Sequence, residues 1–272
     1  MGTLKSLAHG AFAAGMALTF PPGWAQAATE DEGKCEPCRV TESFLIELPF
    51  IQEKGTFQAM VSSEYHSARG GRDVLAPISL EYGVSDSWQV GMDWLAWGSS
   101  RAAGEPDERG FGELGLTTKH SFAMKDPRNH LSAGFDLTIL TGRLGGDAVG
   151  GRPSLLFGRD FPRCHNLNLF SEVAFDWRQK VRASDGGDDG SAAHEIFAGA
   201  GALIPLGNFC LSGEIAWSNN RWNHGGTMNE LFLAPGVTWQ ISDAWQCGVA
   251  APVGLNEGSD RFQVIGRVMF EF

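Results

Sequence analysis

The C-terminal stretch RFQVIGRVMFEF, residues 261–272, alternates apolar and polar side chains with a period of two. One parity carries Phe262, Val264, Gly266, Val268, Phe270 and Phe272, and the other carries Arg261, Gln263, Arg267 and Glu271. Because successive side chains of a β-strand point to opposite faces, the stretch is predicted to be a strand with one apolar and one polar face.

The same alternation recurs along almost the whole chain, in about twelve segments that are each close to the roughly ten residues a tilted strand needs to cross a bilayer. The segments are 56–66, 74–83, 87–97, 110–122, 130–140, 150–161, 166–178, 194–204, 208–219, 228–240, 244–253 and 261–272. Every second connection is tight, and the intervening ones are mostly longer and rich in glycine and charge. Short turns on one rim and long loops on the other are typical of outer-membrane barrels. The predicted fold class is all-β: an antiparallel transmembrane outer-membrane β-barrel of about 12 strands.

Aromatic residues gather near both ends of these segments, where the amphipathic rings of a membrane barrel meet the lipid headgroups. A soluble β-sandwich is the alternative, because its strands also alternate. Charged residues are almost absent from the apolar parity, with Arg159 as the main exception. The terminal Phe272 is similar to the C-terminal aromatic signature read by the barrel-insertion machinery, which is therefore an expected partner.

The N-terminus has the pattern of a secretory signal peptide over residues 1–27, with Lys5, an apolar stretch and the small-x-small site Ala25-Gln26-Ala27. Residues 28–54 are expected to form a periplasmic N-terminal segment that could plug the barrel, and residues 55–272 the barrel. The formal net charge of −11 becomes −12 when Lys5 is removed with the signal, since residues 1–27 hold no acidic residue. An acidic chain is a poor match for nucleic acid, so no nucleic-acid partner is expected.

The polar parity should line the lumen, because the sequence offers no second apolar face. The predicted lumen-lining residues are Glu64, Glu81, Asp93, Glu113, Lys119, Asp136, Arg152, Glu172, Asp176, Glu214, Glu230 and Arg267. Two interpretations stay open: the charges line a solute path that favours cations or neutral polar groups, or they pair across a sealed polar interior. Glu113 and Lys119 are about 20 Å apart along one strand, so each needs a partner elsewhere, with Glu81 a candidate for Lys119.

Five cysteines, Cys35, Cys38, Cys164, Cys210 and Cys247, are expected at the periplasmic rim. An oxidising periplasm makes them disulfide candidates, although an odd number leaves at least one thiol unpaired. A metal site formed by the CxxC of Cys35 and Cys38 with Cys164-His165 is the weaker alternative. No metal, no cofactor and no catalytic residue are predicted. Ser191 and His194 could form a lipid-hydrolase pair, but no nucleophile motif surrounds them.

Several motifs carry a resemblance to a known family. They are Gly55–Gln58, then PISLEYGVSDSWQVG at 77–91, then GFGELGLTTK at 110–119, then Leu137–Gly142 and Ala251–Leu255. Together they resemble the "meta-pathway of phenol degradation" family of outer-membrane transporters over about residues 50–272. Three positions depart from the family pattern: Gln89 occupies a position where the family usually has Glu, Glu113 one where it has Asp, and Leu140 one where it has Pro. The resemblance implies a barrel that admits small, often hydrophobic or aromatic, solutes, and it carries over no catalytic residues.

The leading functional hypothesis is a transporter or channel for small solutes in the outer membrane of a Gram-negative bacterium, and not an enzyme. Its expected partners are outer-membrane lipid and lipopolysaccharide, the insertion machinery and a small-molecule solute. The alternatives are a structural or assembly barrel with a sealed polar lumen and a lipid-modifying barrel hydrolase.

Overall fold

The computed structural model describes residues 40–68, 70–102, 106–139, 144, 148–180, 193–222 and 226–272. The proposed signal peptide, together with Cys35, Cys38, Leu140 and Ser191, lies outside the described residues. Within the described part, no helix is long and apolar enough to cross a membrane.

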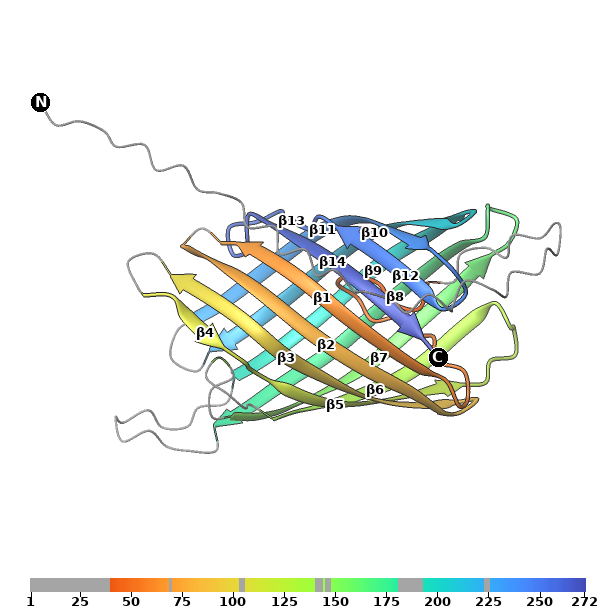
Figure 1. The fold of residues 1–272 in the computed structure, drawn as a ribbon, viewed down its shortest axis with the longest axis horizontal. Coiled ribbons are helices and arrows are strands. Elements are labelled where there is room, and N and C mark those ends of the chain that lie inside the picture. Colours follow the sequence, from red (N-terminus) through yellow and green to blue (C-terminus); the bar gives the residue numbers. More distant parts are fainter. Residues whose placement is uncertain are drawn as a thin grey trace, which may run out of the picture. The chain divides into compact units, whose positions relative to one another are not determined.

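One antiparallel sheet makes up the fold (Figure 1). Its strands are β1 (Phe57–Ser67), β2 (Gly71–Ser85), β3 (Trp88–Ala102), β4 (Glu108–Gly110), β5 (Leu114–Phe122), β6 (Asn129–Ile139), β7 (Ala148–Phe161), β8 (Leu167–Lys180), β9 (Ala193–Leu206), β10 (Phe209–Trp222), β11 (Gly226–Gln240), β12 (Trp245–Ala250), β13 (Val253–Gly254) and β14 (Phe262–Glu271).

The sheet closes on itself, because β1 pairs with β14 from Gln58↔Glu271 to Ser67↔Phe262. The two ends are also joined where Phe57 N–H donates to Phe272 C=O at 2.8 Å and Phe272 N–H donates to Phe57 C=O at 2.9 Å. Closure removes both free edges of the sheet, and a sandwich of two separate sheets is therefore ruled out. The predicted barrel fold is confirmed.

Two of the twelve strand paths are interrupted. β4 and β5 both pair with β3, and β12 and β13 both pair with β11 and β14, so each pair forms one broken strand of the barrel. Pro252 lies in the second break, where a residue without an N–H cannot extend the ladder. The sequence predicted each broken pair as one continuous segment, 110–122 and 244–253. Alternation continues across a short irregularity, so it could not reveal either break.

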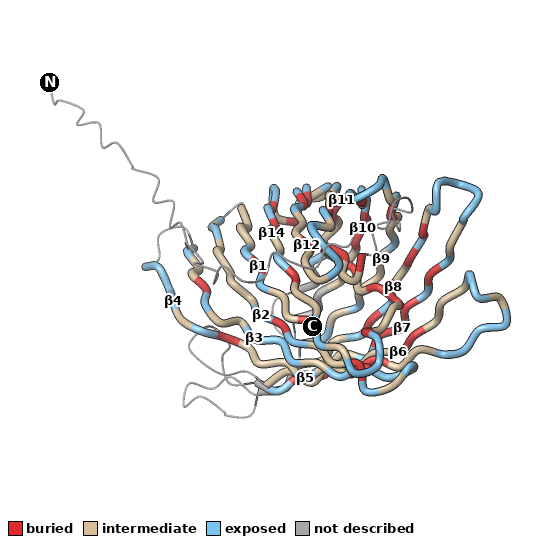
Figure 2. The backbone as a smooth tube through the Cα atoms, turned by 45° about the vertical axis from the view of Figure 1, so that its right-hand side comes forward, coloured by how far each residue is buried: buried red, intermediate tan, exposed pale blue. Residues whose placement is uncertain are grey.

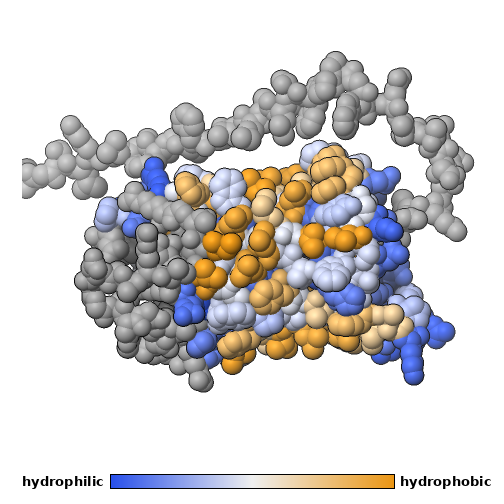
Figure 3. Space-filling view, turned by 90° about the horizontal axis from the view of Figure 1, so that it is seen from below, coloured by the Kyte–Doolittle hydropathy of each residue, from blue (hydrophilic) through white to orange (hydrophobic). Residues whose placement is uncertain are grey.

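The outward parity is apolar, as the alternation predicts. Val61, Leu155 and Val173 expose 54%, 54% and 58% of their surface. Buried and exposed residues alternate along the strands (Figure 2), and apolar side chains cover the middle of the barrel wall with hydrophilic ones towards its ends (Figure 3). Aromatic pairs lie at the short-turn rim, among them Phe57–Phe272 and Trp245–Phe270, with ring centroids 5.5 and 4.5 Å apart.

Candidate functional site

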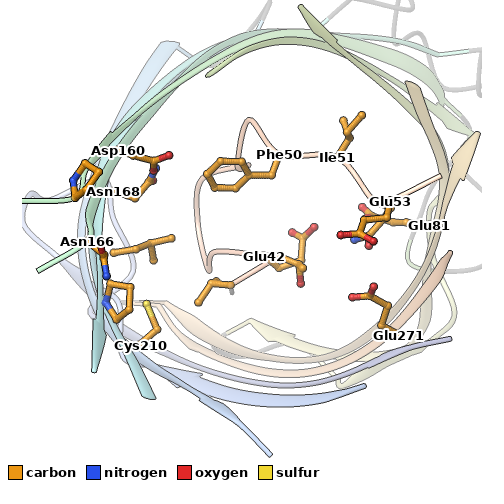
Figure 4. A pocket seen from close by; sticks show the side chains of 16 residues that line it. Glu42, Phe50, Ile51, Glu53, Glu81, Asp160, Asn166, Asn168, Cys210 and Glu271 are labelled. Atoms are coloured by element: carbon orange, nitrogen blue, oxygen red, sulfur yellow. The ribbon is translucent and has the colours of Figure 1, made fainter. Parts of the chain in front are cut away.

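Residues 40–53, called the lumen segment below, run inside the ring of strands. Figure 4 shows Glu42 and Phe50 of this segment within the barrel, facing Glu81, Asp160 and other side chains of the wall. Ile46 and Leu48 expose only 2% and 0% of their surface. The segment leaves the lumen through a tight turn at Gly55, whose φ of 85° is a left-handed conformation that glycine adopts without strain.

Glu214 on β10 holds the backbone of the lumen segment. Its carboxylate accepts hydrogen bonds from the N–H groups of Phe44 at 2.9 Å, Leu45 at 2.7 Å and Ile46 at 3.0 Å. Glu214 is 1% exposed, so these bonds are shielded from water. Carboxylate acceptors make the stronger class of hydrogen bond, and here one side chain satisfies three backbone donors that no strand ladder serves.

Lys119 on β5 holds the next part of the segment. Its ammonium lies 3.1 Å from a carboxylate oxygen of Glu47 and donates to the carbonyl of Leu48 at 3.2 Å. Lys119 is 3% exposed, and a buried cation needs such partners. The candidate partner Glu81 also interacts with Lys119 electrostatically, but among the described residues the carboxylate at ion-pair distance is that of Glu47. The partner comes from the lumen segment because this segment lies between the facing walls of the barrel.

Arg152 on β7 joins the wall carboxylates to each other and to the segment. Its guanidinium lies 2.6 Å from Glu172 on β8 and 3.6 Å from Asp136 on β6. Glu172 in turn accepts a hydrogen bond from the Glu47 N–H at 2.8 Å. Asp136, Arg152 and Glu172 thus form a connected network, and the lumen segment is part of it.

Polar side chains of the wall also bind other carbonyl and N–H groups of the segment backbone. Arg267 on β14 donates to the carbonyls of Ser43 and Phe44, and its guanidinium lies 5.2 Å from the centre of the Phe44 ring. Ser132 on β6 donates to the Pro49 carbonyl at 2.6 Å. Gln89 on β3 accepts from the Gln52 N–H at 2.8 Å.

Apolar side chains of the segment fill recesses in the wall that glycines create. A Cβ at Gly199 would lie 2.7 Å from Ile46 Cγ1, and one at Gly236 would lie 2.7 Å from the Phe44 ring. Ile46 and Leu48 pack in one buried cluster with Val40, Phe170, Leu203 and Cys210. Shape complementarity with the wall therefore supplements the ionic contacts.

Two cavities remain beside the segment. One of about 510 Å³ lies towards the short-turn rim and is lined by apolar groups such as Phe50, Ile51 and Leu203, together with acidic Glu42 and Glu81. The other, of about 230 Å³, is lined largely by charged groups, including Asp93, Asp136 and Arg152. Burial, and after it the nearby Glu81 carboxyl, raise the pKa of the Glu42 carboxyl to about 8.

Glu81 accepts a hydrogen bond from the Gln52 side chain of the lumen segment at 3.3 Å. Glu64, Glu113, Asp176 and Glu230 lie towards the long-loop rim instead, and their hydrogen bonds and ion pairs join them to other described residues of the wall. Glu113 pairs with Arg178 at 2.8 Å, which confirms that its partner lies on another strand. Asp176 lies 3.5 Å from Arg178, Glu64 lies 3.3 Å from His66, and Glu230 accepts from Ser218 at 3.4 Å. The sequence missed Glu42, Glu47 and Gln52 as site residues, because the irregular segment that carries them has no periodic signal. It placed Ser132 on the polar parity but did not mark this uncharged side chain as a site residue.

Three of the five disulfide candidates, Cys164, Cys210 and Cys247, lie in the described part of the chain. Cys164 and Cys247 are free thiols. Cys210 is buried on the inward face, whereas Cys247 has the outward parity of its ladder partners Val268 and Trp239, so the wall separates the two. Alternation along the strands explains this difference, because rim position alone does not fix which face a side chain takes. His194, the described member of the suggested hydrolase pair, stacks on Phe175 at 5.7 Å.

No protein-family model matches the chain. No curated protein matches it in sequence either. Solved structures do match. An outer membrane channel from Pseudomonas putida F1 has a TM-score of 0.66 at 12% identity, covering 81% of this chain and 97% of that one. The NanC porin has a TM-score of 0.55 at 12% identity, covering 79% of this chain and 98% of that one. The beta domain of the Bordetella autotransporter BrkA has a TM-score of 0.55 at 13% identity, covering 81% of this chain and 100% of that one. These likenesses show the fold that the chain shares with outer-membrane barrels, and membership of the phenol-degradation family stays a prediction.

Proposed function

We propose that this chain is an outer-membrane channel for small solutes whose lumen is closed by residues 40–53. The apolar outer wall supports insertion in a membrane, since a soluble protein rarely exposes contiguous apolar patches larger than a few hundred Å². The short-turn rim, which carries Phe272, faces the periplasm in this account, and residues 1–27 direct export. Two of the structurally similar proteins are a channel and a porin.

The observation that carries the proposal is the way the lumen segment is held. Glu214, Lys119 and Arg267 bind its backbone and side chains from three different strands. Among the described residues, the segment is attached to the barrel covalently only through residues 54–56, so within this part of the chain its displacement breaks non-covalent contacts alone. This arrangement supports a closed state that opens by release of the segment.

The charge of the lumen favours particular solutes. The walls and segment around the smaller cavity contribute six carboxyl groups, Glu42, Glu47, Glu81, Asp93, Asp136 and Glu172, against Arg152 and Arg267. An acidic lining favours cations over anions. The apolar groups around the larger cavity add room for a small solute with a hydrophobic part, such as an aromatic amine.

Solute flux into liposomes tests the proposal. The full chain is compared with Glu214→Ala, which removes the acceptor of three segment N–H groups, using matched organic cations, organic anions and neutral sugars. The variant should admit solutes faster than the wild type, and cations faster than anions of equal size. Glu230→Gln, a carboxyl near the long-loop rim that makes no described contact with the segment, should behave as the wild type.

A sealed structural barrel is the second candidate, and the dense bonding of the lumen segment favours it. This candidate predicts no flux from the wild type or from the Glu214→Ala variant, provided that both migrate as folded barrels on unheated gels. Flux that appears only in the variant supports the closed channel instead.

A further inference from the structure

A basic recess lies on the outer surface of the wall near the long-loop rim. It has a volume of about 290 Å³ and is lined by Arg72 of β2, Arg101 of β3 and Arg109 of β4, together with Asp107 and Trp97. The recess is separate from the lumen, because its strand residues share the outward parity of Val74 and Tyr65. Nothing in a solute path through the barrel requires these arginines.

The strand register forces two of these cations together. Arg72 and Arg101 are direct partners in the β2–β3 ladder. Directly opposed residues of an antiparallel pair have Cβ atoms only about 5 Å apart, and like charges placed so are destabilising. A β-bulge at Ala76/Pro77 shifts the register, which gives Trp97 and Arg101 the outward parity of Trp94. Without it, the alternation would direct Arg101 into the lumen.

The recess carries an uncompensated positive charge. Asp107 lies 3.3 Å from Arg101 and 3.2 Å from Arg109, so one carboxylate serves two arginines. In the described part of the chain, no carboxylate lies within ion-pair distance of Arg72. Three guanidinium groups against one carboxylate leave a formal charge of +2. Arg101 and Arg109 are 55% and 65% exposed, so most of their N–H donors remain accessible.

Apolar surface continues from the recess towards the middle of the wall. Trp97 is 45% exposed and lines the recess, and Trp94 and Phe111 are 38% and 52% exposed beside it, with ring centroids 6.5 Å apart. A ligand that fills this surface must be anionic at the rim and apolar below it. Arginine forks match the geometry of phosphate oxygens.

We propose that Arg72, Arg101 and Arg109 bind a phosphate group of lipopolysaccharide, the phosphorylated glycolipid of the outer leaflet, with its acyl chains against Trp97, Trp94 and Phe111. The recess lies on the lipid-facing side of the long-loop rim, which the orientation proposed above places in that leaflet. The inference rests on the outer-membrane location and not on solute transport. Basic recesses on membrane proteins bind anionic lipid headgroups by the same electrostatics.

The test measures lipid binding to the full chain in detergent micelles by native mass spectrometry. The probes are purified lipopolysaccharide, the same preparation after enzymatic dephosphorylation, and inorganic phosphate. The variants are the triple substitution R72A/R101A/R109A, the charge-retaining R72K/R101K/R109K and Asp107→Asn. Arg159→Ala is the matched control, because Arg159 is also an exposed arginine of outward parity but lies at the short-turn rim.

Wild type and Arg159→Ala should bind lipopolysaccharide alike, and the triple alanine variant should bind on the order of 100-fold more weakly, if each arginine contributes about fivefold. The lysine variant should fall between them, and Asp107→Asn should bind more tightly. Equal binding by the wild type and the alanine variant, or equal binding of dephosphorylated lipid, would overturn the proposal. Inorganic phosphate that binds as tightly as the lipid would also overturn it, because the apolar surface would then contribute nothing. Solute flux is a separate measurement, so loss of either function is distinguishable from loss of the other.

Discussion

The Lys119 ammonium on β5 lies 3.1 Å from the Glu47 carboxylate, so a strand of the wall and a segment that precedes the barrel in sequence share a buried ion pair. The ion pair exists only while residues 40–53 lie inside the barrel, because Glu47 belongs to that segment and Lys119 to the wall. The pair therefore couples the position of the lumen segment to the state of the lumen, and the predictions below follow from that coupling.

The contribution of the Lys119–Glu47 pair is measurable by a double-mutant cycle. Lys119→Met should destabilise the barrel by about 3–5 kcal/mol, because one partner of a largely buried pair loses its counter-charge. Glu47→Gln should cost less, since the Leu48 carbonyl still accepts from Lys119. Urea-induced unfolding in lipid vesicles gives the free energies of unfolding of the wild type, the two single variants and the double variant. The coupling energy between the two residues should be about 0.5–3 kcal/mol. Strictly additive effects would mean that the two residues do not interact.

Glu214→Ala should loosen the lumen segment more than the barrel. Three buried N–H groups lose their acceptor, at about 1–3 kcal/mol for each one that finds no substitute. We expect faster proteolysis within residues 40–53, while the barrel remains resistant to protease and to unheated detergent. Glu214→Gln retains one oxygen acceptor and should lie between alanine and the wild type. A segment equally protected in all three proteins would contradict the role assigned to Glu214.

Closure should weaken as the pH rises. In the seated segment the pKa of Glu42 is about 8, against an ordinary value of 4.5, with burial as the main cause. A released segment regains the ordinary pKa and therefore binds fewer protons than the seated one between pH 4.5 and about 8. By proton linkage the seated state loses stability across this window as pH increases. Conductance in planar bilayers should rise accordingly.

Glu42→Gln supplies the control for the pH dependence, because the wall carboxyls are the same in both proteins. Its conductance should change less between pH 4.5 and pH 8 than that of the wild type. An identical rise in both proteins would assign the effect to other groups.

The outward apolar parity predicts a depth-dependent cost of charge. Val173→Arg in the middle of β8 should destabilise the barrel in lipid by about 2–4 kcal/mol, whereas Leu206→Arg at the short-turn end of β9 should cost about 0–1 kcal/mol. Both side chains are exposed, at 58% and 51%, so a difference cannot come from protein packing. Equal effects in vesicles would argue against a membrane-embedded wall.

The barrel was predictable because alternation recurs in about twelve segments, and turn length and aromatics near the strand ends are local signals that accompany it. Partners inside the lumen were less predictable. Arg152 and Glu172 share an inward parity that the sequence reveals, but Glu47 reaches Lys119 only because residues 40–53 enter the barrel. That path depends on long-range contacts such as Glu214 with Phe44, and no periodic pattern encodes them. The bulge that turns Arg101 outward is similarly invisible to a count of alternating residues.

A reversible lock on the lumen segment tests the central claim most directly. A Cβ at Gly199 would lie 2.7 Å from Ile46 Cγ1, so cysteines at positions 46 and 199 fall within disulfide range. The pair Ile46→Cys and Gly199→Cys is placed in a Glu214→Ala background whose five native cysteines are serine, and single-channel conductance is recorded before and after reduction. We predict a disulfide that holds conductance low and an increase when it is reduced. A pair that never forms the disulfide, or a conductance that reduction leaves unchanged, would contradict closure of the lumen by residues 40–53.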